Sequence, residues 1–265
     1  MELKKNMLKE KWGVRWLIVY SELAKTPVFS IENVQRVTRN VKTAYSQLNR
    51  LMKKGLIRRI RKDIYSAINP TTGLIVANPY QIACAITNTA YISHHSAFEY
   101  YGLSNQVYEV YVSSETKFNH FEFGGIVYKF VQSRMQEGVV EAKKTIGVRI
   151  TDLERTVIDG IRDLNRIGGL EELLACLQAV PFLDEQKLMQ YLKKYNTQSL
   201  YQKAGYLFEH YRKNMHLSEH FISYCKDKIG KSRPYLVRET SDSCYDSEWQ
   251  LMVPERLHKI MTLTT

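Results

Sequence analysis

Residues 30–68 read SIENVQRVTRNVKTAYSQLNRLMKKGLIRRIRKDIYSAI. Ser30 stands at the N-cap position of a predicted helix, because serine caps helices well and the apolar residues that follow recur at helical spacing. These residues are Ile31, Val34 and Val37. The polar residues 38–40 predict a turn after this helix.

A second predicted helix follows this turn and covers residues 41–54. Asn40 can cap it, and Gly55 is the expected stop. Its apolar face holds Val41, Ala44, Leu48 and Leu51. Two strand-like runs come next, residues 56–60 and 64–68, and the residues Arg61-Lys62-Asp63 between them predict a hairpin turn.

An earlier helix is predicted from Gly13 to Lys25, because the next two residues, Thr26-Pro27, disfavour helix. Its apolar face would hold Val14, Leu17, Ile18 and Leu23. Three short helices with a tight turn, followed by a basic hairpin, are typical of a winged helix-turn-helix. The sequence therefore predicts a DNA-binding domain over residues 1–70, called the head below.

The outward side of the third predicted helix carries the candidate DNA contacts. In this motif the N-terminal half of the recognition helix reaches base edges, and flanking cations hold phosphates. The candidate base readers are Lys42, Thr43, Ser46 and Gln47. Gln47 could pair with adenine and Lys42 with guanine. The candidate phosphate contacts are Arg50 and the wing residues Arg58, Arg59, Arg61 and Lys62.

The distribution of charge supports this interpretation of the head. Residues 1–70 contain 16 Lys and Arg against 5 Asp and Glu, whereas residues 71–265 contain 22 of each. The whole net charge of +11 therefore belongs to the head. A basic module attached to a neutral one favours a polyanion-binding head and a body with another task. A merely solvated basic surface is the alternative.

Residues 71–265, called the body below, follow a turn-rich stretch at Asn69–Gly73 that predicts a linker. Residues 71–150 predict a mixed unit, with Ser93 capping a helix and Gly124-Gly125 turning a hairpin. Residues 151–265 predict a mainly helical unit, with an irregular end from residue 232. The expected fold class is α+β, predominantly helical.

The helix after residue 150 begins with Thr151-Asp152-Leu153-Glu154, which matches a capping box. Leu153, Val157, Ile161 and Leu164 would form its buried stripe. Arg155 and Asp159 lie four residues apart, so a surface ion pair between them is expected. Capping and the helix dipole account for Asp152 and Glu154 without chemistry.

The chain offers few candidates for catalysis or metal binding. His216, Glu219 and His220 fit H-x-x-E-H, which on one helix could bind zinc and would suit a metal-dependent hydrolase. Adjacent His94 and His95 would point in different directions. The four cysteines are scattered, which favours reduced thiols. The sequence has no phosphate-binding glycine loop, no G-x-S-x-G motif and no dinucleotide fingerprint, and no enzyme activity, metal or cofactor is expected.

Several segments together resemble the AbiEi family of antitoxins and transcriptional repressors from abortive-infection toxin–antitoxin systems. Residues 55–65 are similar to its basic wing, although the family often has glycine where this chain has Asp63. The stretch YISHHSAFEYYGL, residues 91–103, resembles its signature helix, and TDLERTVID, residues 151–159, resembles its second block. Residues 204–209 and Trp249 fit weaker blocks.

The resemblance implies an autorepressor that binds inverted repeats in its own promoter as double-stranded DNA. It also implies a body that counters a cognate nucleotidyltransferase-like toxin in phage defence, with the two signature helices mainly building the core. The family supplies no catalytic residues. With no apolar run long enough for a membrane span, a cytoplasmic, nucleoid-associated protein is expected. The alternatives are a regulator whose body senses a small molecule in a deep apolar pocket, and the hydrolase at His216 and His220.

Overall fold

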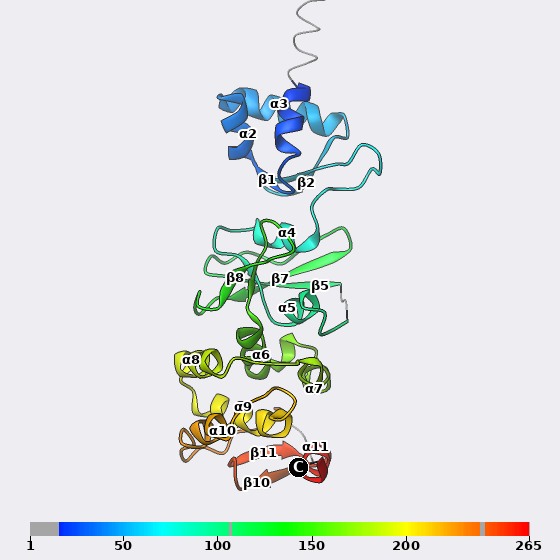
Figure 1. The fold of residues 1–265 in the computed structure, drawn as a ribbon. Helices are drawn as coiled ribbons and strands as arrows, with labels where there is room; N and C mark the ends of the chain where they lie inside the picture. The colour runs from blue at the N-terminus through cyan, green and yellow to red at the C-terminus, as the bar shows by residue number, and fades with distance from the viewer. Residues whose placement is uncertain (1–15, 106–107, 239–241, 265) are drawn as a thin grey trace, which may run out of the picture.

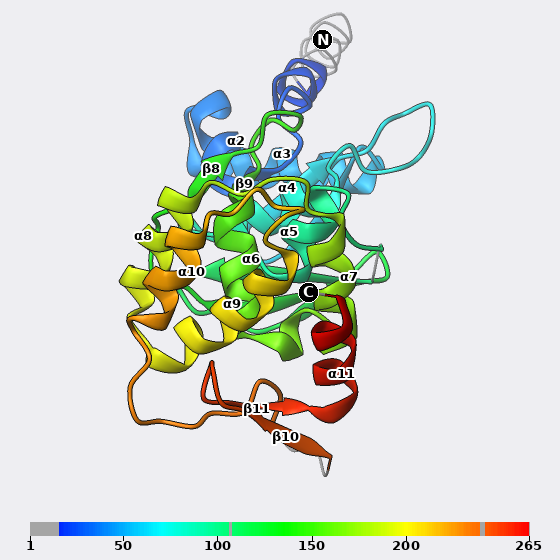
Figure 2. The same ribbon diagram turned by 60° about the horizontal axis from the view of Figure 1, so that its bottom comes forward.

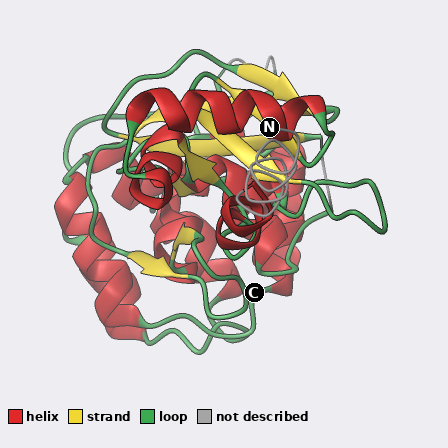
Figure 3. Cartoon of the chain, turned by 90° about the horizontal axis from the view of Figure 1, so that it is seen from above, coloured by secondary structure: helices red, strands yellow, loops and turns green. Residues whose placement is uncertain are grey.

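The computed structural model describes residues 16–105, 108–238 and 242–264, and the chain is a mixed α+β protein as predicted. Helices make up more of it than strands (Figure 3). Its parts are stacked along one direction (Figure 1). The head lies at one end, a six-stranded sheet and layers of helices follow, and a C-terminal hairpin lies at the far end.

The head contains the helices and the hairpin that the sequence predicts. Ser30 and Asn40 cap its second and third helices, since their side chains accept hydrogen bonds from the backbone N–H groups of Asn33 and Thr43. Asp63 turns the hairpin with a φ of 61°, a left-handed conformation that glycine adopts more readily. The elements are a helix over residues 16–23, α2 (Ile31–Thr38), α3 (Val41–Lys53), β1 (Phe29–Ser30), β2 (Ile57–Arg61) and β3 (Ile64–Ala67). The strands pair antiparallel in the order β1-β3-β2.

The first helix buries only part of the predicted face. Leu23 is buried as predicted, but Leu17 and Ile18 are more than half exposed, and Val19 is buried in the core of the head in their place. Residues 13–15 of the predicted helix lie outside the described residues. Because the sequence is apolar on almost every side of this helix, the spacing of its apolar residues does not select the buried face.

The head is packed onto the body and not merely tethered to it. The predicted linker, Asn69–Gly73, is the tip of a loop whose flanks pair antiparallel at Ile68 and Ile75. One face of the β2–β3 hairpin belongs to the core of the head. The other face places Ile60 and Ile64 in the hydrophobic cluster of the body. The two parts therefore share a buried contact.

The part of the body next to the head, residues 79–151, is a mixed sheet with two short helices (Figure 1). Gly124 and Gly125 turn the predicted hairpin with φ angles of 63° and 77°. The strand order is β6-β7-β5-β4-β9-β8, with β5–β7 and β4–β9 parallel and the other pairs antiparallel. The elements are α4 (Pro79–Cys84), β4 (Tyr91–Ile92), α5 (His95–Tyr100), β5 (Glu109–Ser114), β6 (Phe121–Phe123), β7 (Ile126–Gln132), β8 (Val139–Glu141) and β9 (Arg149–Thr151).

The lower part of the body is a layered helical unit (Figure 2). It contains the predicted helices, but its C-terminal segment is more regular than predicted. That segment forms an antiparallel hairpin and a final helix, and Trp249 in the hairpin turn is buried. The elements are α6 (Leu153–Arg162), the 3-10 turn η1 (Leu164–Arg166), α7 (Leu170–Ala179), α8 (Glu185–Tyr195), α9 (Gln198–Tyr211), α10 (Glu219–Lys226), β10 (Ser243–Asp246), β11 (Leu251–Pro254) and α11 (Glu255–Thr264).

Two helices of the body start one residue later than predicted. The N-cap of α5 is His94, and Ser93 instead bonds the Ser113 hydroxyl over 2.7 Å. The N-cap of α6 is Asp152, whose carboxylate accepts from the Arg155 N–H. A carboxylate beside a hydroxyl is the stronger acceptor for a helix terminus, so the capping-box prediction at Thr151 was wrong by one position.

Two further expectations concern the cysteines and membrane spans. All four cysteines are free thiols, and three of them are buried, as expected. Burial raises the pKa of Cys84 to about 11, so this thiol stays protonated at neutral pH. Within the described residues, no helix has both the length and the apolar character that crossing a bilayer requires.

Candidate functional site

The outer face of α3 is a polar, basic surface at the end of the head that lies far from the body (Figure 1). Its exposed residues recur three or four positions apart and so share one side of the helix. They are Lys42, Tyr45, Ser46, Asn49 and Lys53, together with Val41, which is 54% exposed and so does not lie on the buried face where the sequence placed it. Of the four predicted base readers, Lys42 and Ser46 lie on this face and Thr43 is half-buried beside it. Tyr45, Asn49 and Lys53 were not among the predicted contacts, although their spacing from Lys42 and Ser46 puts them on the same face.

Gln47 does not lie on the outer face, so that prediction was wrong. Its side chain is 3% exposed and packs on the inner side of the helix with Ala44 and Leu51. Its Oε1 is buried without a hydrogen-bond partner in the described part of the chain. The spacing explains the placement, because Gln47 is three residues after Ala44 and four before Leu51.

The wing adds further exposed cations to the head, on strands that lie on its side toward the body (Figure 1). Arg58, Arg59 and Lys62 are exposed, and Arg50 is half-buried. Arg59 stands opposite Tyr65 in the hairpin. Burial raises the pKa of Tyr65, while the charge of Arg59 opposes that shift and Tyr45 adds to it. Tyr65 is only 5% exposed and belongs to the core of the head, so it lies beneath the surface that these cations form.

Arg61 lies against the body and not on the outer surface of the wing. Its guanidinium carbon is 4.8 Å from the ring centroid of Phe121 and 5.8 Å from that of Phe118. Its Nη1 is buried and has no hydrogen-bond partner among the described residues. Because Arg61 makes this cation–π contact, it stabilises the packing of the head on the body. The prediction that Arg61 contacts phosphates was therefore wrong.

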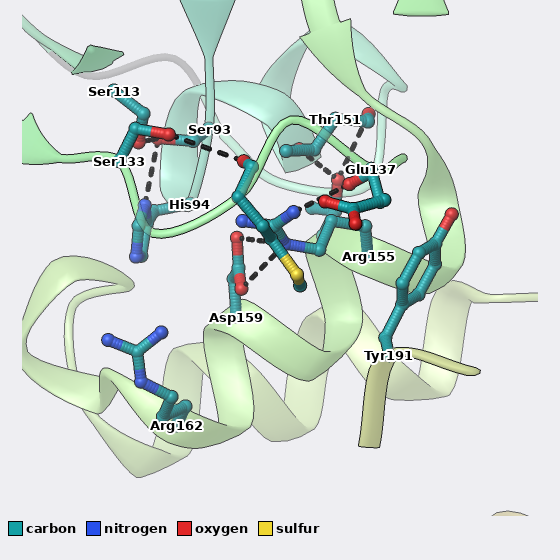
Figure 4. A network of polar contacts seen from close by, with 12 residues as sticks. Ser93, His94, Ser113, Ser133, Glu137, Thr151, Arg155, Asp159, Arg162 and Tyr191 are labelled. Carbon is teal, nitrogen blue, oxygen red and sulfur yellow. Dashed lines mark hydrogen bonds and ion pairs between the residues drawn. The ribbon is translucent and has the colours of Figure 1, made fainter. Parts of the chain in front are cut away.

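The body contains a buried polar network centred on α6 (Figure 4). The predicted pair of Arg155 and Asp159 forms, but it lies in the interior, with side chains 2% and 3% exposed. The Arg155 Nε is 3.0 and 2.9 Å from the two carboxylate oxygens of Asp159. Arg155 Nη1 donates to the Glu137 carbonyl over 2.7 Å, and the Tyr195 hydroxyl donates to Asp159. The expected surface position was wrong because Tyr195 of α8 and the segment at Glu137 cover the pair.

The other end of the network holds α6 to α8. The Tyr191 hydroxyl donates to Asp152 over 2.7 Å, and the Lys187 ammonium lies 3.2 Å from both Asp152 and Glu154. A Cβ at Gly138 would lie 2.6 Å from the Tyr191 hydroxyl, so this glycine leaves room for that bond. These acidic residues therefore have structural partners, and the network fastens neighbouring elements.

His94 joins the network to the sheet from a strained backbone position. Its φ of 54° and ψ of −133° lie outside the regions that non-glycine residues usually adopt. Its Nδ1 is 2.9 Å from the Ser93 hydroxyl and its Nε2 is 3.4 Å from Asp163. Arg162 and Arg166 approach the same Asp163 oxygen at 3.1 and 3.0 Å. Three donors thus converge on one carboxylate oxygen, whereas His95 faces Glu172.

This convergence predicts an acid-dependent stability. Burial acts to raise the pKa of Asp163, but the hydrogen bond from His94 and the charges of Arg162 and Arg166 outweigh it and lower the pKa. The stabilisation is therefore present above the unfolded pKa, about 3.9, and is lost as the pH falls through the lower folded value. We expect Asp163→Asn to flatten the decline of urea midpoints in this acidic range. Asp227→Asn, at an exposed carboxylate, is the control, and an unchanged decline in Asp163→Asn would contradict the prediction.

The H-x-x-E-H sequence does not lie on one helix. Ser218 is the N-cap of α10, so Glu219 and His220 are in its first turn and His216 stands in the preceding turn with a φ of 56°. Among the described residues, no group of three or more His, Cys, Asp or Glu is placed to hold a metal ion. The hydrolase alternative therefore loses the shared helix face on which it depended.

The body has two cavities that bear on the small-molecule alternative. The larger, about 640 Å³, lies between α9, α10 and the C-terminal hairpin, and its charged groups pair with one another. Lys226 contacts Glu209 at 3.1 Å and also Glu248, and Arg212 contacts Glu219 at 2.9 Å. The smaller, about 200 Å³, lies where α4 and α5 meet β5 and has unpaired polar atoms in its wall.

Comparison with known proteins finds a similar fold among solved structures. No protein-family profile matches the chain, and no curated protein matches it significantly. Among solved structures, the crystal structure of the Rv2827c protein from Mycobacterium tuberculosis is similar, with a TM-score of 0.64 and 14% sequence identity. The similarity covers 96% of this chain and 95% of that chain. At this identity, the comparison shows that the two proteins share a fold over nearly their whole lengths.

Proposed function

We propose that the head is a winged helix-turn-helix that binds double-stranded DNA, and that the chain represses its own promoter. The observation that carries the proposal is the exposed polar face of α3, which lies at the end of the head far from the body (Figure 1) and belongs to a head with further exposed cations on the β2–β3 hairpin. The head also holds the whole net charge of +11. A helix with a polar outer face beside exposed cations suits a major groove between two phosphate backbones.

The exposed residues divide into two groups by chemistry. Lys42, Ser46 and Asn49 can reach base edges, and Asn49 has the amide that pairs with adenine. Lys53, Arg58, Arg59 and Lys62 are cations that would hold phosphates, with Thr43 and Arg50 at the edge of the surface. Gln47 and Arg61 are left out, because one is buried and the other lies on the body.

The proposal predicts salt-dependent binding to DNA from upstream of the gene. Arg58→Ala with Lys62→Ala should weaken binding to every sequence and reduce the slope of log K against log salt by about 2, since each phosphate contact contributes about 1. Fluorescence anisotropy with labelled duplexes measures both quantities. Lys193→Ala with Lys194→Ala, which removes the same charge from exposed positions on α8, should leave the slope unchanged. Binding that ignores salt, or no binding at low salt, would refute the proposal.

We further propose that the body is an antitoxin that counters a nucleotidyltransferase-like toxin. Support comes from the resemblance of residues 91–103 and 151–159 to the AbiEi family. These two stretches pack together, since β4 pairs with β9 and the Tyr101 hydroxyl donates to the Thr151 carbonyl over 2.7 Å. They build the core, as expected, so the surface that meets a toxin would be elsewhere.

Co-expression with the adjacent gene tests the antitoxin role. If that gene encodes a toxin, this chain should restore growth, and the variant Arg58→Ala with Lys62→Ala should restore it equally because those residues belong to the head. Expression of the toxin must come from an unrelated promoter, so that repression does not contribute. An adjacent gene with no toxicity, or toxicity that this chain does not relieve, would contradict the proposal.

A further inference from the structure

The smaller cavity of the body is lined by a carboxylate and a phenol whose polar atoms are not all paired within the described part of the protein. It encloses about 200 Å³ where α4, α5 and the starts of β5 and β7 come together. Tyr80, Glu99 and Tyr100 form its polar and aromatic side. Val110 and Ile126 form its aliphatic side, and Thr145 contributes from the loop before β9. The cavity thus combines an apolar wall with a single acidic group.

Two polar atoms in this wall lack partners. Glu99 Oε2 and the Tyr100 hydroxyl are both buried and have no hydrogen-bond partner in the described residues. No ion pair joins Glu99 to a described lysine or arginine. Leaving a buried acceptor unsatisfied is destabilising, and more so when the group is charged. Such atoms are usually satisfied by water or by a ligand.

The other carboxylate oxygen of Glu99 is hydrogen-bonded, and this bond fixes the side chain. The Tyr80 hydroxyl donates to Glu99 Oε1 over 2.5 Å. Burial, together with the hydrogen bond to Glu99, raises the pKa of Tyr80, so this phenol remains a donor at neutral pH. The rings of Tyr80 and Tyr100 meet edge to face, with centroids 5.6 Å apart. This contact fixes the aromatic wall around the free oxygen of Glu99.

We propose that this cavity binds an organic cation, an alkylammonium or a guanidinium group. The positive group would pair with Glu99 Oε2 and donate a hydrogen bond to the Tyr100 oxygen, while its alkyl part would contact Val110 and Ile126. Aromatic rings beside a carboxylate favour such cations through the ring quadrupole. A single carboxylate offers too few hard ligands for a divalent metal ion. The cavity, at about 200 Å³, has room for the end of a lysine or arginine side chain.

The same cation could come from a free small amine or from a basic side chain of a partner protein. Four probes separate these sources. They are n-butylammonium, N-acetyl-lysine methylamide, a short peptide with one lysine, and acetate as the anionic control. Titrations followed by NMR chemical shifts or calorimetry measure each affinity on the full-length chain. The measurement does not depend on DNA, so it stands or falls apart from the role of the head.

The decisive variant is Glu99→Gln, which keeps the side-chain size and removes the charge. It should weaken binding of the cations by about ten-fold or more, because a hydrogen bond to a charged group contributes about 1.5–3 kcal/mol. Glu171→Gln removes the same charge from an exposed position on α7 and should leave the affinity unchanged. Tyr100→Phe keeps the ring and should give a smaller loss than Glu99→Gln.

The outcomes are distinguishable. Equal binding of n-butylammonium and the lysine probes supports the proposal with a free amine as ligand. Binding of the lysine probes alone supports it with a partner side chain as ligand. No saturable binding of any cation at millimolar concentration, equal binding of acetate, or a Glu99→Gln variant that melts normally and binds as the wild type would overturn it.

Discussion

Arg155→Met should lower the free energy of unfolding by about 3–5 kcal/mol, because it leaves the Asp159 carboxylate buried without its counter-charge. The side chain of Asp159 is 3% exposed, so water cannot take the place of the guanidinium. Burial alone would lower the pKa of Arg155, yet the charge of Asp159 outweighs it and raises the pKa. The variant also loses the hydrogen bond from Arg155 to the Glu137 carbonyl. Urea unfolding followed by circular dichroism measures the loss.

A neighbouring exposed ion pair supplies the control for Arg155. Lys194 contacts Glu137, and both side chains are exposed, so Lys194→Met should cost less than about 1 kcal/mol. Arg155→Met combined with Asp159→Asn removes both charges and keeps an acceptor for the Tyr195 hydroxyl. This double variant should therefore be more stable than Arg155→Met alone. Equal losses for Lys194→Met and Arg155→Met would show that the buried charge does not determine the effect.

Local signals in the head specify its elements. Ser30 and Asn40 are caps in both the sequence and the structure, and Gly55 follows α3 with a φ of 67°. Such signals act within a few residues, so one sequence contains them completely. The faces of the helices are a different matter. Gln47 is buried although it is polar, and Leu17 is exposed although it is apolar. The packing of the whole helix determines which face is buried, and a single residue does not.

Contacts between residues far apart in the sequence determine which polar side chains are buried, and local sequence patterns did not predict these contacts. The spacing of Arg155 and Asp159 predicts their pair, but its burial depends on α8, whose Tyr195 lies 36 residues after Asp159. Arg61 is basic like its neighbours, and only the phenylalanines of the body turn it inward. The cavity at Glu99 likewise depends on Tyr80, nineteen residues away, and on strands still further along. The candidate DNA surface was therefore predicted in part, and the cavity was not predicted.

Gly205→Ala should destabilise the protein by about 3 kcal/mol, at the upper end of what an overpacked core costs. Gly205 lies in the middle of α9, and a Cβ there would be 1.9 Å from Cζ3 and 2.1 Å from Cη2 of Trp249. Ordinary carbon contacts are about 3.5–4.0 Å, so the indole would have to leave its place. Trp249 is 1% exposed, and its Nε1 donates to Glu209 over 2.7 Å. The C-terminal hairpin depends on this docking, since Trp249 stands in its turn.

The sign of the effect separates this account from helix propensity. In a helix without the clash, alanine in place of glycine would stabilise by about 0.5–1 kcal/mol. Urea midpoints give the sign, and a red shift of tryptophan fluorescence in the folded protein would report that the indole has moved into water. Trp249→Leu is itself destabilising, but it removes the atoms that meet the new Cβ. Adding Gly205→Ala to it should therefore cost much less than adding Gly205→Ala to the wild type. Stabilisation by Gly205→Ala alone would mean that the helix and the indole are not in contact at this position.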